Sequence, residues 1–302
     1  LEWMPTEQTL SDEETIRLIR IGVGKLGIRQ VRFTGGEPLL RKSLEKIIAA
    51  TKQLRTDQGR SPSTALTTNG LGLEKRAGAL AAAGLDRINI SLDTIDRERY
   101  AALTRRDRLD HVLQAIAAAD AAGLHPIKIN AVVMPGVNEE DIVPLADYAV
   151  HHGAQLRFIE QMPLGPREQW RREDMVTAED ILTRLRTHFS MEPAREPRGS
   201  APAALWEVSA PDGTHGTLGI IASVTHPFCG DCDRTRLTTD GAIRNCLFGN
   251  SETPLRDLLR SGASDAEIME AWAGEMWTKK PGHGIDDEGF LQPDRPMSAI
   301  GG

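Results

Sequence analysis

Short β-branched runs alternate with helical stretches as far as residue 190, and this alternation limits the possible folds more than any other feature of the sequence. A capping box of Ser11 and Glu14, then apolar residues at helical spacing and Gly27, predicts a helix first. Strands are expected around Val31, Leu66, Ile88, Ile129 and Phe158, and helices over 44–54, 74–83, 111–122 and 141–151. Repeated βαβ units predict a parallel sheet, either open or curled into a barrel.

The pattern changes after residue 190. The segment 191–204 carries three prolines among charged and small residues, which is typical of a linker. Antiparallel strands are expected over 205–208 and 217–222, a hairpin turning at Asp240-Gly241 over 236–245, and then two helices and a polar tail. We therefore expect a barrel domain over 1–190, a linker over 191–204 and a smaller α+β domain over 205–302.

Polar residues occupy alternate positions of several expected strands. Period two places one set on the face away from the helices: Arg32, Asn89, Ser91, Asp93, Lys128, Asn130 and Arg157. A buried polar group without a partner is costly, so this face is either open to water or lines a barrel lumen that holds a polar ligand. The two arginines and the lysine favour an anionic ligand.

Two loops follow the carboxyl ends of the first two expected strands, where barrel enzymes keep their catalytic residues. The first, 34–38, contains Gly35-Gly36, which allow a backbone to approach a ligand closely. The second is 67–70. Each loop alone is more typical of a simple turn into a helix, but two such loops in register favour a binding site.

The composition excludes some classes of protein. The 302 residues include 36 Lys and Arg against 43 Asp and Glu, a net charge of −7, so no general basic face for nucleic acid is expected. No apolar stretch approaches the roughly 18 residues of a membrane span. The three cysteines cannot all pair as disulfides, which indicates a reducing compartment and a metal site.

Cys229 and Cys232 form a CxxC knuckle. The expected hairpin would bring Cys246 back beside them as a third ligand. Structural zinc needs four ligands, and the local candidate for the fourth is His226. An iron–sulfur cubane held by three thiolates would instead leave one iron free for a substrate atom. The local sequence leaves both alternatives open.

Arg234 and Arg236 lie two residues apart on the expected strand that follows Cys232. They therefore share one face of that strand and could hold phosphate. They are equally typical of surface charge. An ideal two-residue loop places Cys246 opposite Thr235, on the other face from these arginines, and one bulge would reverse that register.

Together these motifs resemble the GTP 3′,8-cyclase family of molybdenum-cofactor biosynthesis, whose members are radical S-adenosylmethionine (SAM) enzymes. The likeness covers essentially the whole chain. It rests on residues 31–39, 67–70, 88–93, 128–130, 156–160 with Met162, 228–236, 246–248 and 301–302. The last three segments are much more specific than the glycine loop that radical SAM enzymes share.

The resemblance implies a partial (β/α)6 TIM-type barrel with a smaller C-terminal α+β domain that carries a second cluster. It implies a lyase that uses SAM and a 5′-deoxyadenosyl radical to convert GTP to (8S)-3′,8-cyclo-7,8-dihydroguanosine 5′-triphosphate, the first step of molybdenum-cofactor synthesis. The implied cofactors are two [4Fe–4S] clusters and SAM. No side chain is assigned as catalytic, because the cofactor supplies the difficult chemistry.

The resemblance also assigns site residues. Gly36, Ser91 and Met162 are expected to bind SAM. GTP is expected to contact Arg32, Thr67, Lys128, Arg234, Thr235 and Arg236. Cys229, Cys232 and Cys246 are expected to hold the second cluster, and Gly301-Gly302 is similar to a tail that enters the active site.

In this family a CxxxCxxC triad holds the first cluster. The opening residues 1–5 are similar to the stretch that follows the triad, so we expect the first strand and the triad to lie upstream of this chain. The resemblance further implies a cytoplasmic enzyme without membrane or nucleic-acid partners, and is compatible with a homodimer. Its protein partners would be a reductase or a flavodoxin- or ferredoxin-type electron donor and, next in the pathway, cyclic pyranopterin monophosphate synthase.

Two other functions are compatible with parts of the sequence. One is a different radical SAM enzyme with an auxiliary cluster, although the run 234–236 and the Gly-Gly tail argue against it. The other is a non-catalytic zinc-binding module built on His226 and the three cysteines.

Overall fold

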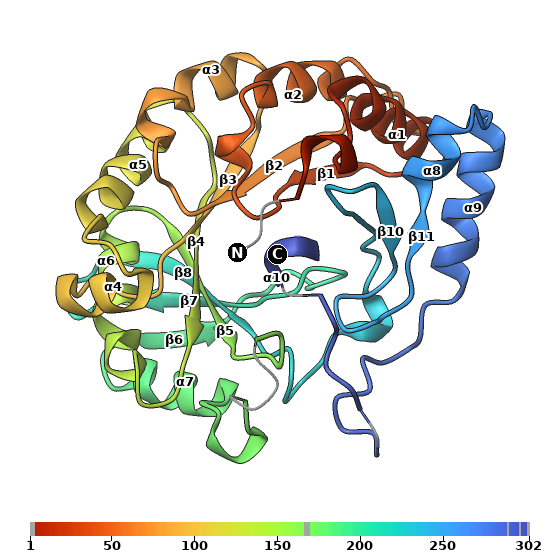
Figure 1. Ribbon diagram of the computed structural model, residues 1–302. Helices are drawn as coiled ribbons and strands as arrows, with labels where there is room; N and C mark the ends of the chain where they lie inside the picture. The colour runs from red at the N-terminus through yellow and green to blue at the C-terminus, as the bar shows by residue number, and fades with distance from the viewer. Residues whose placement is uncertain (1–3, 166–169, 289, 296, 301–302) are drawn as a thin grey trace. The chain divides into compact units, whose positions relative to one another are not determined.

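The computed structural model describes residues 4–165, 170–288, 290–295 and 297–300 (Figure 1). The chain divides into two compact units. Unit 1 comprises Leu1–Thr67, Gly78–Asp86 and Arg234–Gly302, and unit 2 comprises Thr68–Ala77 and Arg87–Asp233. No helix in the described ranges is both long and apolar enough to cross a membrane.

Unit 1 combines the first helices and strands with the C-terminal part of the chain. Its first elements are η1 (Thr6–Gln8), α1 (Asp12–Lys25), β1 (Gln30–Phe33), η2 (Pro38–Leu40), α2 (Leu44–Lys52), β2 (Ser63–Thr68, up to Thr67) and α3 (Ala77–Ala82, from Gly78). Its later elements are β9 (Arg236–Leu237), β10 (Ala242–Arg244), β11 (Thr253–Pro254), α8 (Leu255–Arg260), α9 (Asp265–Trp277) and α10 (Met297–Ile300). Strands β1 and β2 are parallel, and β11-β10-β9 form a small antiparallel sheet.

Helix α1 of unit 1 forms as the sequence predicts. The Ser11 side chain accepts a hydrogen bond from Glu14 N over 3.1 Å, and Glu14 accepts one from Ser11 N over 2.8 Å. Gly27 follows the helix with φ +71°, a conformation that glycine adopts without strain. One face of α1 packs on the β10 hairpin, α8 and α9 through a buried cluster: Leu10, Leu18, Ile21, Ile243, Leu255, Leu259, Ile268 and Trp272.

Unit 2 contains a sheet in which the strands of the described residues follow the order β3-β4-β5-β8-β7-β6. Its elements are η3 (Leu73–Lys75), β3 (Arg87–Ser91), α4 (Arg97–Thr104), α5 (Leu109–Ala121), β4 (Ile127–Val133), η4 (Glu139–Asp141), α6 (Ile142–His151), β5 (Gln155–Glu160), η5 (Arg172–Asp174), α7 (Ala178–Arg186), β6 (Ser190–Pro193), β7 (Ala204–Ser209), β8 (His215–Ile221) and η6 (Cys229–Asp231). Strands β3, β4, β5 and β8 are parallel, whereas β8, β7 and β6 pair antiparallel. Parallel strands connected by helices confirm the predicted α/β class, and β6 leaves this sheet with an open edge, as in a partial barrel.

The segment expected as a linker, 191–204, is structured differently. Its first three residues belong to β6, which pairs with β7, and β7 continues through β8 into the parallel part of the sheet. Pro193 is compatible with this position because β6 is an edge strand and needs no further backbone donor. Residues 191–193 are therefore strand, and the division into a domain over 1–190, a linker and a domain over 205–302 stays a prediction.

Candidate functional site

The strands of unit 2 present the predicted polar face. In their parallel register Asn89 lies beside Lys128, Ser91 beside Asn130, and Asn130 beside Arg157. Residues paired in this way point to the same side of a sheet. The intervening apolar residues are fully buried on the other side, where α5 and α6 contact β4 and β5.

Arg157 is held on this face by two hydrogen bonds to its neighbour Asn130. Its Nε and Nη2 both donate to Asn130 Oδ1, over 2.9 and 2.7 Å, and the residue is only 4% exposed. On β8 its partner is Gly219, where a Cβ atom would lie 2.9 Å from Arg157 Cγ. Because Gly219 has no Cβ atom, the aliphatic part of the Arg157 side chain can occupy this space.

The predicted polar residue Asp93 lies just beyond β3. Its Oδ1 accepts from Val132 N over 2.8 Å, and Asn138 Nδ2 donates to the backbone oxygens of Asp93 and Val132, each over 2.9 Å. Burial raises the pKa of the Asp93 carboxyl, and the hydrogen bond from Val132 only partly offsets it. These contacts connect the ends of β3 and β4.

The residues predicted to bind SAM occur in both units. Ser91 ends β3 and Met162 follows β5 in unit 2, where Ser91 is exposed and Met162 half-buried. Gly36 lies in unit 1, in the loop after β1, and is exposed. Its neighbour Gly35 has φ +134°, in the region that favours glycine, and a methyl group there would lie 3.9 Å from Thr239 Oγ1 of the β9–β10 hairpin.

Two of the residues predicted to bind GTP share a face of the β1–β2 pair in unit 1. Arg32 pairs with Ala65, and Thr67 lies two residues further along β2 on the same side. Val31 and Phe33 point the other way and pack against the apolar side of α1 and α2. The predicted alternation of β1 is thus confirmed.

The β9–β10 hairpin of unit 1 differs from the expected register. Arg236 pairs with Arg244 and Leu237 with Ile243, so the loop contains three residues rather than two. Gly241 closes it with φ +81° and donates its N–H to Thr238 O over 2.9 Å. A glycine in this conformation at the end of the loop adds one residue to the turn. Of the two registers that the sequence leaves open, the structure therefore has the one shifted by one residue from that of an ideal two-residue loop.

The run 234–236 is supported by contacts that sequence reasoning missed. Trp272 Nε1 donates to Thr235 Oγ1 over 2.9 Å, and Lys279 Nζ donates to Arg234 O over 3.0 Å. These partners lie 37 and 45 residues further along the chain, so no local pattern could identify them. Arg234 is exposed and Arg236 half-buried.

Cys246 follows two buried polar residues in unit 1. The Arg244 side chain is 2% exposed and contacts Glu252 and the carbonyl oxygen of Gly249. Asn245 Nδ2 donates to Glu275 O over 3.0 Å, at the C-terminal end of α9. The Cys246 thiol itself is free and half-buried.

Cys229 and Cys232 belong to unit 2, where both are half-buried. They form a single turn, with Cys232 N donating to Cys229 O over 3.2 Å. His226, the fourth ligand of the zinc alternative, is exposed. Among the described residues, no group of three or more His, Cys, Asp or Glu side chains is arranged to hold a metal ion. The predicted tail residues Gly301-Gly302 lie outside the described part of the chain.

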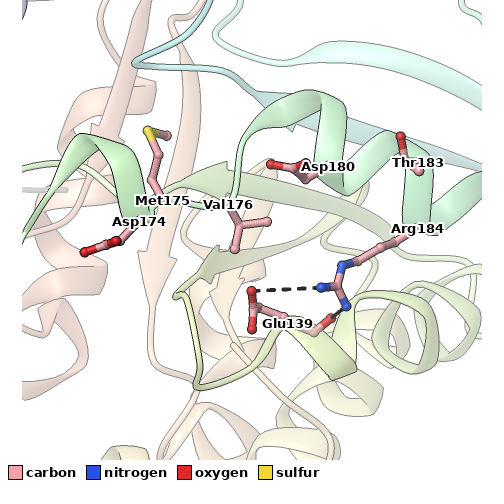
Figure 2. Close-up of a pocket in the computed structure, with 7 residues that line it drawn as sticks. All are labelled: Glu139, Asp174, Met175, Val176, Asp180, Thr183 and Arg184. Carbon is pink, nitrogen blue, oxygen red and sulfur yellow. Dashed lines mark hydrogen bonds and ion pairs between the residues drawn. The ribbon is translucent and has the colours of Figure 1, made fainter.

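A pocket of about 290 Å³ in unit 2 lies elsewhere. Figure 2 shows its lining residues: Glu139, Asp174, Met175, Val176, Asp180, Thr183 and Arg184. Arg184 Nη1 donates to Glu139 O over 3.4 Å. No residue predicted to bind SAM or GTP lines this pocket, and we assign it no function.

Comparison with known proteins identifies the family. A family model described as Radical SAM superfamily matches residues 2–149, and one described as Molybdenum Cofactor Synthesis C matches residues 154–285. A GTP 3′,8-cyclase of Corynebacterium glutamicum is 74% identical over 305 residues, covering 100% of this chain and 81% of that protein. GTP 3′,8-cyclase 2 of Mycobacterium tuberculosis is 57% identical over 303 residues, covering 100% of this chain and 83% of that protein.

Solved structures give more distant similarities. Streptococcus suis SuiB, bound to its precursor peptide SuiA, is 20% identical with a TM-score of 0.48, covering 59% of this chain and 38% of that chain. From the near relatives and the two family models, the chain belongs to the GTP 3′,8-cyclase family of the radical SAM superfamily.

Proposed function

We propose that the chain converts GTP to (8S)-3′,8-cyclo-7,8-dihydroguanosine 5′-triphosphate in the first step of molybdenum-cofactor synthesis. The observation that carries this proposal is the 74% identity to the Corynebacterium glutamicum GTP 3′,8-cyclase over the whole of this chain. The molybdenum-cofactor family model over residues 154–285 supports it independently.

SAM and a [4Fe–4S] cluster follow from the radical SAM family. When bound, SAM supplies a 5′-deoxyadenosyl radical after reductive cleavage. We assign its contacts to Gly36, Ser91 and Met162. Their positions support this assignment, because each follows or ends a parallel strand of its unit, at the carboxyl end where barrel enzymes bind ligands.

We assign GTP to six residues: Arg32, Thr67, Lys128, Arg234, Thr235 and Arg236. Guanidinium and ammonium groups suit the triphosphate, since arginine can bind phosphate through two parallel hydrogen bonds. Lys128 lies on the polar face of unit 2, and Arg32 and Thr67 share a face in unit 1. The support of Thr235 by Trp272 would hold the run 234–236 in place for such contacts.

A second [4Fe–4S] cluster is assigned to Cys229, Cys232 and Cys246. All three cysteines are half-buried, and thiolates are the usual ligands of such clusters. Three protein ligands would leave one iron open to the guanine of GTP. The alternative zinc module is less favoured, because His226 is exposed and the family is that of a cluster enzyme.

The wider setting is proposed on the same basis. A reductase or a flavodoxin- or ferredoxin-type protein would supply electrons, and cyclic pyranopterin monophosphate synthase would consume the product. We place the enzyme in the cytoplasm, where free thiols persist. A homodimer is compatible with these assignments.

The test is anaerobic reconstitution of the full-length protein with iron and sulfide, followed by incubation with GTP, SAM and a reductant. We expect two clusters, 5′-deoxyadenosine and the cyclised nucleotide. Zinc as the only metal would contradict the proposal. Clusters that form while GTP is neither bound nor consumed would favour a different radical SAM enzyme.

A further inference from the structure

A fully buried carboxylate lies at the carboxyl end of β5 in unit 2. Glu160 Oε1 accepts from Ala178 N over 2.8 Å and from Thr225 Oγ1 over 2.5 Å. Its Oε2 accepts from Val224 N over 2.8 Å and from Thr225 N over 2.9 Å. Glu160 is 0% exposed, and a charge this deeply buried needs such a set of donors to replace water. The carboxylate therefore joins three segments that are distant in the sequence.

Two of these segments carry proposed cofactor residues. Met162, assigned to SAM, follows Glu160 by two residues, and Trp170 Nε1 donates to the intervening Gln161 O over 2.8 Å. The turn that contains Val224 and Thr225 leads into the Cys229 turn. The third segment is the start of α7. Glu160 is thus the shared partner of the Met162 segment and the cysteine segment.

A second contact holds the cysteine segment within unit 2. The Arg198 guanidinium lies over the Phe228 ring, 4.9 Å from its centroid. Arg198 is itself fixed, because its Nε donates to Ala201 O over 2.7 Å and its Nη2 to Pro202 O over 2.8 Å. The chain is therefore anchored at Thr225 and again at Phe228, immediately before Cys229.

We propose that Glu160 is a positioning residue, which sets the Cys229–Cys232 turn relative to the SAM-binding segment at Met162. This inference rests on the proposed function, since both ligand assignments belong to it. Positioning of this kind affects catalysis because a displacement of about 1 Å between reacting groups can lower a rate about 100-fold.

The hydrogen-bond pattern predicts how substitutions should differ. In Glu160→Gln the amide oxygen can take the Oε2 place and still accept from Val224 N and Thr225 N. Its NH₂ group then faces Thr225 Oγ1, which can rotate to accept, and the Ala178 N–H, which loses its acceptor and opposes another donor at the start of α7. Both bonds to the turn at Val224 and Thr225 are kept. Glu160→Leu leaves all three backbone N–H groups without their acceptor. We therefore expect the glutamine variant to retain the position of the turn and the leucine variant to lose it.

Thr177→Ala is the matched control. Thr177 caps the same helix, since its Oγ1 accepts from Asp180 N over 3.2 Å and donates to Asp180 Oδ2 over 2.6 Å. Its loss weakens the start of α7 without removing a partner of Val224 or Thr225. Any effect of Glu160→Leu beyond that of Thr177→Ala is then due to the displaced turn.

The experiment uses the full-length protein with its clusters reconstituted. It records iron and sulfide content, the electron paramagnetic resonance spectrum with and without GTP, and the ratio of 5′-deoxyadenosine to cyclised product. For Glu160→Leu we expect loss of the GTP-induced spectral change and a ratio raised about tenfold. Glu160→Gln should stay close to the wild type, and spectra of Glu160→Leu that match those of Thr177→Ala would overturn the inference.

A second pair of variants decides the question if Glu160→Leu fails to fold. Thr225→Val removes one hydrogen bond to the carboxylate, whereas Thr225→Ser keeps it. We expect the valine variant to raise the same ratio and the serine variant to restore it, and equal ratios would overturn the inference. If the wild type itself binds no second cluster and does not respond to GTP, the proposed function fails instead, which is a distinguishable result.

Discussion

Single glycines determine where the charged side chains of this chain can lie. Gly219 is the clearest case, because an added Cβ would approach Arg157 Cγ to 2.9 Å and the side chains of Ala203 and Leu205 to 3.2 Å. Gly24, within α1, has open space around its Cβ position. The same substitution should therefore have opposite effects at the two sites.

We expect Gly219→Ala to lower the thermal unfolding midpoint, because overpacking costs about 1–3 kcal/mol. Gly24→Ala should raise it, since alanine is favoured over glycine in a helix interior by about 0.5–1 kcal/mol. Calorimetry of both variants under the same conditions is the measurement. An unchanged midpoint for Gly219→Ala would mean that Arg157 can move aside at little cost.

The two arginines beside the cysteine knuckle provide a test of the GTP assignment. Arg234→Ala and Arg236→Ala should each weaken GTP binding about tenfold or more, because a hydrogen bond to a charged group contributes about 1.5–3 kcal/mol. Iron content should not change. Arg20→Ala, which removes a surface arginine whose side chain is 58% exposed, is the control in equilibrium binding. Loss of iron in Arg234→Ala or Arg236→Ala would show that these arginines are structural.

At the scale of elements, local sequence signals predicted which helices and strands form. The five expected strands exist as β1 to β5, the capping box begins α1, and the strands expected over 205–208 and 217–222 pair antiparallel as β7 and β8. These elements depend on residues within a few positions of one another, which is why a sequence can indicate them.

The sequence did not determine features that depend on backbone choice or distant partners. The hairpin register depends on whether Gly241 closes a two-residue or a three-residue loop, and the residues of this loop are compatible with both. The sequence predicts a linker where β6 lies, because an exposed edge strand carries the same prolines and charged residues as a linker. The partners of Glu160 lie 18 to 65 residues away in sequence.

An ion pair between helix α6 and the β7–β8 turn of unit 2 should make stability depend on pH. His151, the last residue of α6, contacts Asp212 Oδ2 through Nε2 over 2.8 Å and Asp147 O through Nδ1 over 2.8 Å. The Asp212 carboxylate, then the Asp147 carbonyl, raise the pKa of His151, and His151 lowers the pKa of Asp212. Both shifts favour the charged pair in the folded state.

The directions of the two pKa shifts determine how stability changes with pH. The raised histidine pKa contributes stability that is complete below the unfolded value of about 6.5 and is lost as the pH rises through the folded pKa. The lowered aspartate pKa contributes stability above about 3.9 that is lost in acid. We expect the thermal unfolding midpoint of Asp212→Asn to change less between pH 6 and 8 than that of the wild type. The pKa of His151, measured by NMR, should be lower in this variant. A His151 pKa that does not change would show that the pair does not form in solution.

Over the whole molecule, the net charge of −7 conceals the charges that concern function. The residues assigned to GTP are mostly cationic, yet they come from both compact units: Lys128 from unit 2 and the other five from unit 1. The cysteines are divided in the same way, with Cys246 in unit 1 and the other two in unit 2. Sequence motifs identified these residues singly, but their distribution depends on tertiary packing that no motif records.

The identity of the metal decides between the catalytic and the non-catalytic function of the whole chain. If the three cysteines hold an iron–sulfur cluster, Cys229→Ser and Cys246→Ser should each lower the iron content and abolish GTP cyclisation, while SAM cleavage persists. His226→Gln should leave the iron content unchanged, because three thiolates suffice for a cluster with one open iron. If they hold zinc, four ligands are needed, and His226→Gln should reduce bound zinc as strongly as either cysteine variant. Metal analysis of the four full-length proteins, wild type included, separates the two cases without depending on activity.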